Sequence, residues 1–308
     1  MTKDITNLPA SVHDRLSNIA KEYSQTFQQV FYFYALERFL YRLSKSEYES
    51  NFVLKGALMF FGWGVPLRRL TRDIDLQGYI SNDVENLILI MRRACIQPVE
   101  ADGMRYDPES VVGESIIEEA DYEGVRIRFI GYLGTAEIHL QVDVSFADDI
   151  TPAVNEINYP TLLPKLGMEP FPIRGYPFET SIAEKFQTMV VKGEINSRMK
   201  DFYDIWAMIQ HFEILGVTLV NAIKNTFKTR KTSIPENKPV ALTIKFAELK
   251  DSDWARFYHN LNPPQIIHAD FQDVIEDLRT FLIPPMNAAS KEENFDLVWL
   301  PGKGWVDN

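Results

Sequence analysis

The sequence predicts an α+β protein, in which a mixed sheet with flanking helices is followed by a mainly helical C-terminal domain. Over residues 1–150, segments with helical spacing of apolar residues alternate with segments of strand periodicity. Six prolines then punctuate residues 152–177, and the pattern beyond them is helical. A length of 308 residues agrees with two domains. We therefore expect N-terminal helices and the sheet in residues 1–165, and the helical domain in residues 166–308.

The N-terminal part is expected to begin with a long helix. Residues 11–45 have apolar side chains at spacings of three and four, without Gly or Pro, which predicts one helix. Residues 51–64 predict a short lead-in and then a helix whose first turn begins near Gly56. A strand over residues 73–79 and an amphipathic helix over residues 84–96 follow.

Two further strands are predicted from alternation of apolar and polar residues, over residues 122–134 and 137–148. In the second strand the apolar residues share one face, and Asp143 lies on the polar face. An irregular connection is expected over residues 152–177. Helices are then expected over residues 179–192, 198–212, 216–228, 251–261 and 270–282. The tail from residue 283 has a mixed pattern that predicts no element.

Composition excludes several classes of protein. The sequence has no run of about 18 apolar residues, so we expect no membrane span. Its first residues lack an apolar signal core, so we expect no export. Cys95 is the single cysteine, which excludes an internal disulfide and fits the reducing cytoplasm.

The net charge of −11 argues against sequence-blind binding of nucleic acid, but the charge is unevenly spread. From Lys165 to Lys231, ten Lys or Arg stand against seven Asp or Glu, a local charge of +3 that leaves −14 on the remainder. Such a basic region can hold a phosphate-rich ligand. Within it, Lys224, Lys228, Arg230 and Lys231 are candidate contacts to an RNA backbone, although a solvated helix end has the same pattern.

The stretch "LTRDIDLQGY" places two carboxylates, Asp73 and Asp75, on one strand. Residues two apart share a strand face, so both point the same way while Ile74 and Leu76 point into the core. Like charges this close repel unless a cation lies between them, and Mg²⁺ prefers such hard oxygen ligands together with phosphate. With Asp143, three carboxylates on neighbouring strands predict a two-metal site suited to in-line displacement at phosphorus. A lone DxD is also typical of a solvated turn.

Three neighbouring residues are candidate contacts to a nucleotide. A glycine near a helix start, here Gly56, lets backbone N–H groups approach a phosphate. Lys55 beside it and Arg72 just before the acidic pair can add positive charge. Each of them alone also fits a packing glycine or a solvated basic side chain.

The stretch "ETSIAEKFQTMVVKGEINSRMKDFYDIWAMI" predicts two amphipathic helices that carry charge. Lys185 lies on the flank of the first helix, and Asp201 and Asp204 share a face of the second. We expect Lys185 to hold a triphosphate, and Asp204 to orient Lys185 or the incoming substrate. Two helices with solvated charges would show the same pattern.

Together, "GALMFFGW", "RLTRDIDL" and "LQVDVSF" resemble the nucleotidyltransferase signature of the DNA polymerase beta-like superfamily: a glycine-led helix, an acidic pair and a later single acid. "YPFETSIAEKFQTMVVKGEINSRMKDFYDIW" resembles the second motif of AbiEii/AbiGii-type toxins, a nucleotidyltransferase family of bacterial toxin–antitoxin and phage-defence systems. The resemblance covers roughly residues 10–212 and implies a nucleotidyltransferase-like sheet.

The resemblance also implies roles for the matching residues. Asp73 and Asp75 match the metal-binding pair, and Asp143 matches the third superfamily carboxylate. Lys185 matches the lysine of the second motif and Asp204 its last aspartate, and both are expected to be needed for activity.

Two departures from the family pattern affect these assignments. Ala57 stands where the superfamily often has serine, so a hydroxyl contact to phosphate is absent. The spacing from Lys185 to Asp204 is longer than in the compact form of the motif, which leaves the alignment of Arg198 open. The chain nevertheless keeps all the carboxylates of the signature.

The implied activity is transfer of an NMP from an NTP, with Mg²⁺ as cofactor and pyrophosphate as leaving group. Known members act on tRNA, so its 3′ end is the expected acceptor, and a cognate antitoxin is the expected partner. Two alternatives remain open. In the first, the acceptor of the nucleotide is a protein or a small molecule. In the second, the chain is a catalytically silent protein that binds a nucleotide or a partner. We expect it in the cytoplasm.

Overall fold

A short polar turn divides the N-terminal helical region into two helices. The computed structural model describes residues 7–65, 71–118, 122–146, 150–261 and 270–308. Helix α1 spans Leu8–Glu22 and α2 spans Phe27–Ser44. Thr26 caps α2 and forms a reciprocal capping box with Gln29. The prediction of one helix over residues 11–45 is therefore wrong, because the capping box starts a second helix.

The chain packs as two units. Unit 1 comprises Met1–Ala147 and Asn155–Gly175, and unit 2 comprises Asp148–Val154 and Tyr176–Asn308. The main boundary between the units thus lies between Gly175 and Tyr176, at the end of a strand. A short segment ahead of it also belongs to unit 2.

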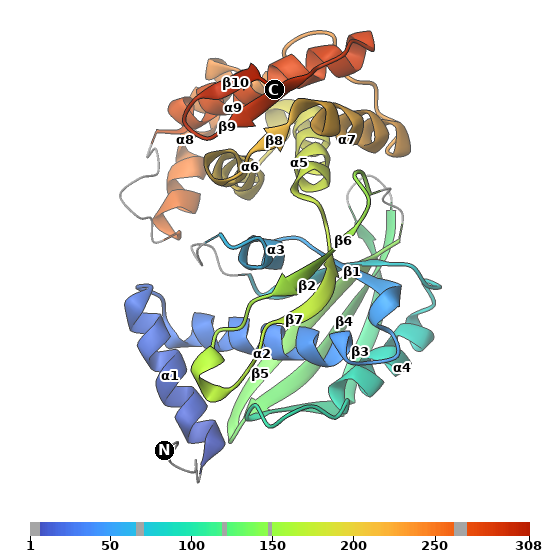
Figure 1. Ribbon diagram of the computed structural model, residues 1–308, viewed down its shortest axis with the longest axis vertical. Coiled ribbons are helices and arrows are strands. Elements are labelled where there is room, and N and C mark those ends of the chain that lie inside the picture. Colours follow the sequence, from blue (N-terminus) through green and yellow to red (C-terminus); the bar gives the residue numbers. More distant parts are fainter. Residues whose placement is uncertain (1–6, 66–70, 119–121, 147–149, 262–269) are drawn as a thin grey trace. The chain divides into compact units, whose positions relative to one another are not determined.

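The described part of unit 1 contains a mixed sheet, as the sequence predicts, and this sheet has seven strands (Figure 1). Its strands are β1 (Phe52–Lys55), β2 (Asp73–Gly78), β3 (Met104–Glu118), β4 (Tyr122–Leu133), β5 (Ala136–Ser145), β6 (Asn155–Tyr159) and β7 (Phe171–Gly175). Their order across the sheet is β3-β4-β5-β2-β1-β7-β6. Strand β2 runs parallel to β5 and β1 runs parallel to β7, whereas the other neighbours are antiparallel.

Helices cover one face of this sheet. Helix α2 packs on β5 and β7, and α4 (Val84–Cys95) packs on β3 and β4 (Figure 1). Ile74, Leu76, Val142 and Val144 are fully buried in the same core as the apolar residues of α2 and α4. The residues between them therefore point to the opposite face of the sheet. The alternation along β2 and β5 thus decides which face carries the carboxylates.

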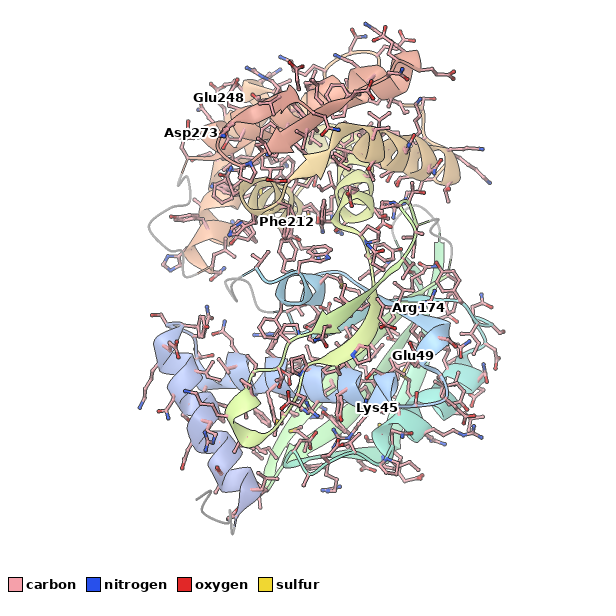
Figure 2. All side chains as sticks on the ribbon, viewed as in Figure 1. Lys45, Glu49, Arg174, Phe212, Glu248 and Asp273 are labelled. Carbon is pink, nitrogen blue, oxygen red and sulfur yellow. The ribbon has the colours of Figure 1, made fainter. Side chains whose placement is uncertain are left out.

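Some strands lie where the sequence predicted none. Strand β1 lies where only a short lead-in was predicted, and β3 has no counterpart among the predicted elements. Strands β6 and β7 lie inside the proline-rich residues 152–177. The prediction of an irregular connection there is wrong, because β6 and β7 pair along their length. Proline is disfavoured inside sheets, but tertiary pairing overrides this here. Arg174 of β7, which is labelled in Figure 2, also donates to the carbonyl of Ser50, just before β1.

A buried ionic network ties α2 to the segment before β3. Asp102 accepts hydrogen bonds from Arg42 at 2.6 and 3.0 Å and from Arg38 at 2.9 Å. Burial alone would raise the pKa of Asp102, but the two guanidinium groups outweigh burial and hold the pKa below its usual value. Glu37, on the same helix, is fully buried and accepts from the amide of Leu162. Burial raises the pKa of Glu37 to about 7, against the opposing charge of Arg38.

Unit 2 is mainly helical, as predicted (Figure 1). Its helices are α5 (Phe178–Lys192), α6 (Met199–His211), α7 (Gly216–Thr229), α8 (Ile244–His259) and α9 (Phe271–Lys291), and a small antiparallel sheet joins β8 (Ile214–Leu215), β9 (Leu297–Leu300) and β10 (Gly304–Asp307). Helix α8 begins before the predicted residue 251, and α9 continues through Pro284 and Pro285. Across the described ranges, no helix is both long and apolar enough to cross a bilayer.

Candidate functional site

A row of charged residues crosses the polar face of the sheet in unit 1. In the strand register, Asp75 of β2 lies opposite Asp143 of β5, and Lys55 of β1 lies opposite Asp75. Arg126 of β4 lies opposite Asp143 on its other side, and Glu114 of β3 lies opposite Arg126. Directly opposed residues share a sheet face, so the row alternates in sign except at the adjacent Asp75 and Asp143. The two adjacent negative charges of Asp75 and Asp143 repel, so a further cation is expected at that point of the row.

Three carboxylates meet at this point of the row. Ligand oxygens of Asp73, Asp75 and Asp143 all lie within 4.8 Å of one another. Asp73 and Asp75 are half-buried, Asp143 is buried, and Thr71 donates through its hydroxyl to Asp73. The structure therefore brings together the three carboxylates that the sequence pattern singles out.

Gly56 leaves the space that the Asp75 side chain occupies. Its φ of +72° favours glycine. A Cβ on residue 56 would lie 1.9 Å from Oδ2 of Asp75. The short helix α3 spans Leu58–Gly62, so it begins after Gly56 and not at it. Close approach to a carboxylate, together with the backbone conformation, is thus what requires glycine here.

Arg126 holds the third carboxylate, and the sequence pattern did not identify it. Its Nε donates to Oδ1 of Asp143 at 2.8 Å and its Nη2 donates to Oδ2 at 2.7 Å. The side-chain amide of Gln141 donates to the same Oδ2 at 3.1 Å. The hydrogen bonds to Asp143 raise the pKa of the Arg126 guanidinium, although partial burial opposes this. A signal was present, because Arg126 lies between the buried Val125 and Ile127 and therefore on the polar face of β4.

The two basic residues predicted to contact nucleotide have different surroundings. Nζ of Lys55 donates to Oγ of Ser145 at 2.7 Å, and Ser145 donates to Oε1 of Gln77 at 3.0 Å. Arg72 is exposed. The cavity beside it has a volume of about 210 Å³ and is lined by Gln28, Gln29, Tyr32, Thr71 and Arg72. The Lys55 ammonium group is therefore held by a hydrogen bond to a side chain of the sheet, whereas the Arg72 side chain is exposed to solvent.

A second charged cluster lies in unit 2 and joins α5 to α6. Nζ of Lys185 lies 3.1 Å from Oδ2 of Asp204 and 3.4 Å from Oδ1 of Asp201. Both carboxylates are buried, and Arg198 also donates to Asp201. Burial alone would raise the pKa of Asp201, but Lys185 and Arg198 outweigh it and lower the pKa. The alternative of solvated charges is thus excluded for the two aspartates.

The sequence profile of one protein family, described as the nucleotidyl transferase AbiEii toxin of type IV toxin–antitoxin systems, matches residues 38–277. This chain belongs to the AbiEii family. The match spans both charged clusters and more than half of the chain. No curated protein matches the sequence.

Three solved structures align with this AbiEii protein over most of its length. The nucleotidyltransferase toxin MenT4 from Mycobacterium tuberculosis H37Rv is 14% identical, with a TM-score of 0.50 over 93% of this chain and 99% of that chain. A crystallised protein from H. pylori is 18% identical, with a TM-score of 0.48 over 84% of this chain and 95% of that chain. JHP933 from Helicobacter pylori is 17% identical, with a TM-score of 0.47 over 83% and 90%. The likeness to MenT4 shows a shared fold.

The carboxylate cluster of this AbiEii protein fits a divalent cation. Its three oxygen donors come from two neighbouring strands and lie close enough for one ion to contact more than one of them. Carboxylate oxygens are the ligands that Mg²⁺ takes in proteins. The adjacent charges of Asp75 and Asp143 also require a countercharge. The donor set thus fits a divalent cation of the Mg²⁺ type.

The basic residues predicted to contact RNA do not all face solvent. Arg230 pairs with Glu184 at 3.2 Å and donates to the side chain of Gln187 at 3.1 Å, so it is engaged within unit 2. Lys228 and Lys231 are exposed, and Lys224 is half-buried. The predicted RNA contact therefore depends on the lysines and not on Arg230.

Proposed function

We propose that this AbiEii protein transfers an NMP from an NTP to an acceptor in a Mg²⁺-dependent reaction, with pyrophosphate as the leaving group. The observation that supports this most strongly is the shared sheet face of Asp73, Asp75 and Asp143, whose oxygens lie within 4.8 Å of one another. A divalent ion held there supplies Lewis-acid stabilisation of phosphate charge. The family match supports nucleotidyl transfer as the class of reaction.

The proposed roles of individual residues follow from their contacts. Asp73 and Asp75 hold the ion, with Asp143 beside them, and Gly56 keeps the space around the acidic pair open. Lys55 and Arg72 bring positive charge for the nucleotide. The protein would act mainly by positioning and charge neutralisation, because phosphoryl chemistry needs little covalent help from side chains.

Lys185 and Asp204 have a proposed role in the same reaction. Lys185 is the candidate triphosphate contact, and the 3.1 Å contact with Asp204 orients its ammonium group. An ammonium held by a buried carboxylate loses little side-chain entropy when it binds a phosphate. This is why both residues are expected to be needed for activity.

The proposed acceptor is the 3′ end of tRNA. The exposed Lys228 and Lys231 support an RNA acceptor, because they place positive charge on the surface of unit 2. A cognate antitoxin would neutralise the protein in the cytoplasm, where NTPs and tRNA are present, within a toxin–antitoxin or phage-defence system. The type IV toxin–antitoxin description of the family supports the antitoxin.

One experiment tests this function. The purified protein is incubated with each labelled NTP in turn, with Mg²⁺ and total cellular RNA, and the labelled fraction is identified. We expect label on tRNA from the wild type and none from Asp73→Asn or Asp75→Asn. Glu137→Gln, which changes an exposed carboxylate on β5, is the matched control and should transfer at the wild-type rate. Full incorporation by Asp75→Asn would overturn the proposed site, and label on protein would replace the tRNA acceptor.

A further inference from the structure

We propose that Arg126 takes the place of a second cation at the carboxylate cluster, so that the cluster binds one divalent ion through Asp73 and Asp75. This inference rests on the proposed function, since it concerns how that metal site is completed. It makes Arg126 a positioning residue that keeps Asp143 neutralised beside the ion.

The hydrogen bonds of Asp143 are the first support. A carboxylate has about four acceptor positions, and Arg126 fills one on each oxygen. Gln141 fills a second position on Oδ2. Three of the four positions are thus filled, and an ion coordinated by both oxygens of Asp143 would have to displace the bidentate guanidinium contact, which is among the stronger contacts a carboxylate makes. Most of the hydrogen-bonding capacity of Asp143 is therefore used by contacts within the protein.

The charges of the row are the second support. Asp73, Asp75 and Asp143 carry −3 together, and the guanidinium of Arg126 reduces this to −2. One divalent ion neutralises that remainder. Lys55 lies opposite Asp75 and adds further positive charge to the row. A second divalent ion would therefore enter surroundings that are already positive, which Coulomb repulsion opposes.

The third support is that Arg126 pairs with Asp143 and not with the other acidic residue opposite it. Glu114 lies directly opposite Arg126 in the register of β3 and β4, so it is an available acidic partner. Glu114 pairs instead with Arg128 at 2.8 Å, and both of those side chains are about half exposed. The Asp143 side chain in the Arg126 pair is only 9% exposed. Arg128 thus makes an ordinary surface ion pair, whereas Arg126 is directed to the acidic cluster.

The test counts bound Mn²⁺ ions per chain in the absence of nucleotide, from the electron paramagnetic resonance signal of free Mn²⁺. We expect one bound ion in the wild type and two in Arg126→Gln. Arg128→Gln, on the same strand and the same face, is the matched control and should bind one ion. Arg126→Lys keeps the charge and should also bind one. Melting curves establish that each variant is folded.

A double variant tests the same idea without changing the net charge. Arg126→Gln combined with Asp143→Asn removes both partners of the ion pair, so it should bind one Mn²⁺ with wild-type affinity. If Asp143 is instead a direct ligand, the affinity of the double variant should fall by at least about tenfold. That fall, two ions in the wild type, or one ion in folded Arg126→Gln would each overturn the inference. No bound Mn²⁺ in the wild type would overturn the proposed metal site itself, and the inference with it.

Discussion

Two single residues define the space and the charge of the candidate site. Gly56 allows the backbone of β1 to pass against Asp75, and Arg126 fixes both oxygens of Asp143. Neither residue is an expected ligand of the proposed ion. Both residues contact the carboxylate cluster, Gly56 at Asp75 and Arg126 at Asp143, so their substitution should change the metal site while the fold is kept.

Replacement of Gly56 by alanine should abolish activity. The new Cβ would lie 1.9 Å from Oδ2 of Asp75, so the carboxylate has to leave its position. The positive φ adds a backbone cost of about 1 to 2 kcal/mol. We expect nucleotide transfer to fall at least about a hundredfold, equivalent to about 3 kcal/mol of transition-state stabilisation.

The control for this prediction is Gly167→Ala. Gly167 has a φ of +78°, but its Cβ would have open space within 4 Å. It therefore carries the backbone cost without the clash. Both variants should lose thermal stability through the backbone cost, Gly56→Ala the more because of its clash with Asp75, and only Gly56→Ala should lose transfer. Equal activity of the two variants would show that Asp75 tolerates displacement.

Lys185 has a structural role that its spacing in the sequence does not reveal. Its ammonium group contacts Asp204 and, together with Arg198, Asp201, and both carboxylates are buried. Lys185→Ala should therefore lower the free energy of unfolding by roughly 3 kcal/mol, because it removes a cation that contacts two buried carboxylates. Lys200→Ala, at an exposed neighbour, should stay within about 0.5 kcal/mol of the wild type.

The measurements for Lys185 are a denaturant titration and transfer rates taken well below the melting temperature. A triphosphate contact is worth about 1.5 to 3 kcal/mol. Folded Lys185→Ala should then transfer at least about tenfold more slowly. Wild-type transfer by the folded variant would leave Lys185 with the structural role alone.

Among the elements, α2 carries charge into the core of unit 1. Its capping box and apolar stripe form the helix, and its buried Arg38 and Arg42 bind Asp102. The same helix covers the sheet face opposite the carboxylates. The stability of α2 therefore supports the register of β2 and β5, on which the acidic cluster depends.

Glu37 of α2 should make stability depend on pH. Its folded-state pKa of about 7 lies above its ordinary value of 4.5, so the folded protein binds this proton more tightly than the unfolded chain. Its stabilising contribution is complete below pH 4.5 and is lost as the pH rises through about 7. Between pH 5 and pH 8 the wild type should lose about 2 to 3 kcal/mol more than Glu37→Gln.

Melting curves at several pH values check this prediction. Glu47→Gln is the control, since Glu47 is an exposed carboxylate whose partner is the exposed Arg93. It should follow the wild-type pH dependence. Parallel curves for the wild type and Glu37→Gln would mean that Glu37 is ionised across this range.

At the scale of the whole molecule, each packing unit carries one of the two charged clusters. Unit 1 holds Asp73, Asp75 and Asp143, and unit 2 holds Lys185, Asp201 and Asp204. The AbiEii family match extends over both units. A toxin activity that requires both clusters should therefore be lost when either one is disrupted in the full chain.

Production of the wild-type protein alone should slow bacterial growth. The expectation follows from the toxin family to which the chain belongs. Asp75→Asn should restore the growth rate at equal protein level, because the proposed metal site is lost. The measurement is the growth rate after induction, with soluble protein quantified in parallel. Unchanged growth with abundant soluble wild-type protein would contradict a toxin while leaving nucleotidyl transfer to be tested in vitro.

The sequence by itself determined the helical and strand periodicities and the shared face of Asp73 and Asp75. These are local properties, because residues two apart on a strand point the same way in any sheet. The same local reasoning placed Asp143 on a polar strand face. It failed at Thr26, where a capping box divides the helix predicted over residues 11–45, and in the proline-rich segment that forms β6 and β7.

The tertiary structure alone decided which distant residues meet. The parallel pairing of β2 with β5 places Asp75 opposite Asp143, and the antiparallel pairing of β4 with β5 brings Arg126 to the same carboxylate. No spacing along the chain encodes this register, because it depends on how strands distant in sequence pair and on how β3, β4, β5 and β7 pack against α2 and α4. Gly56 is required for the same reason, since its conflict with Asp75 exists only after β1 and β2 have paired.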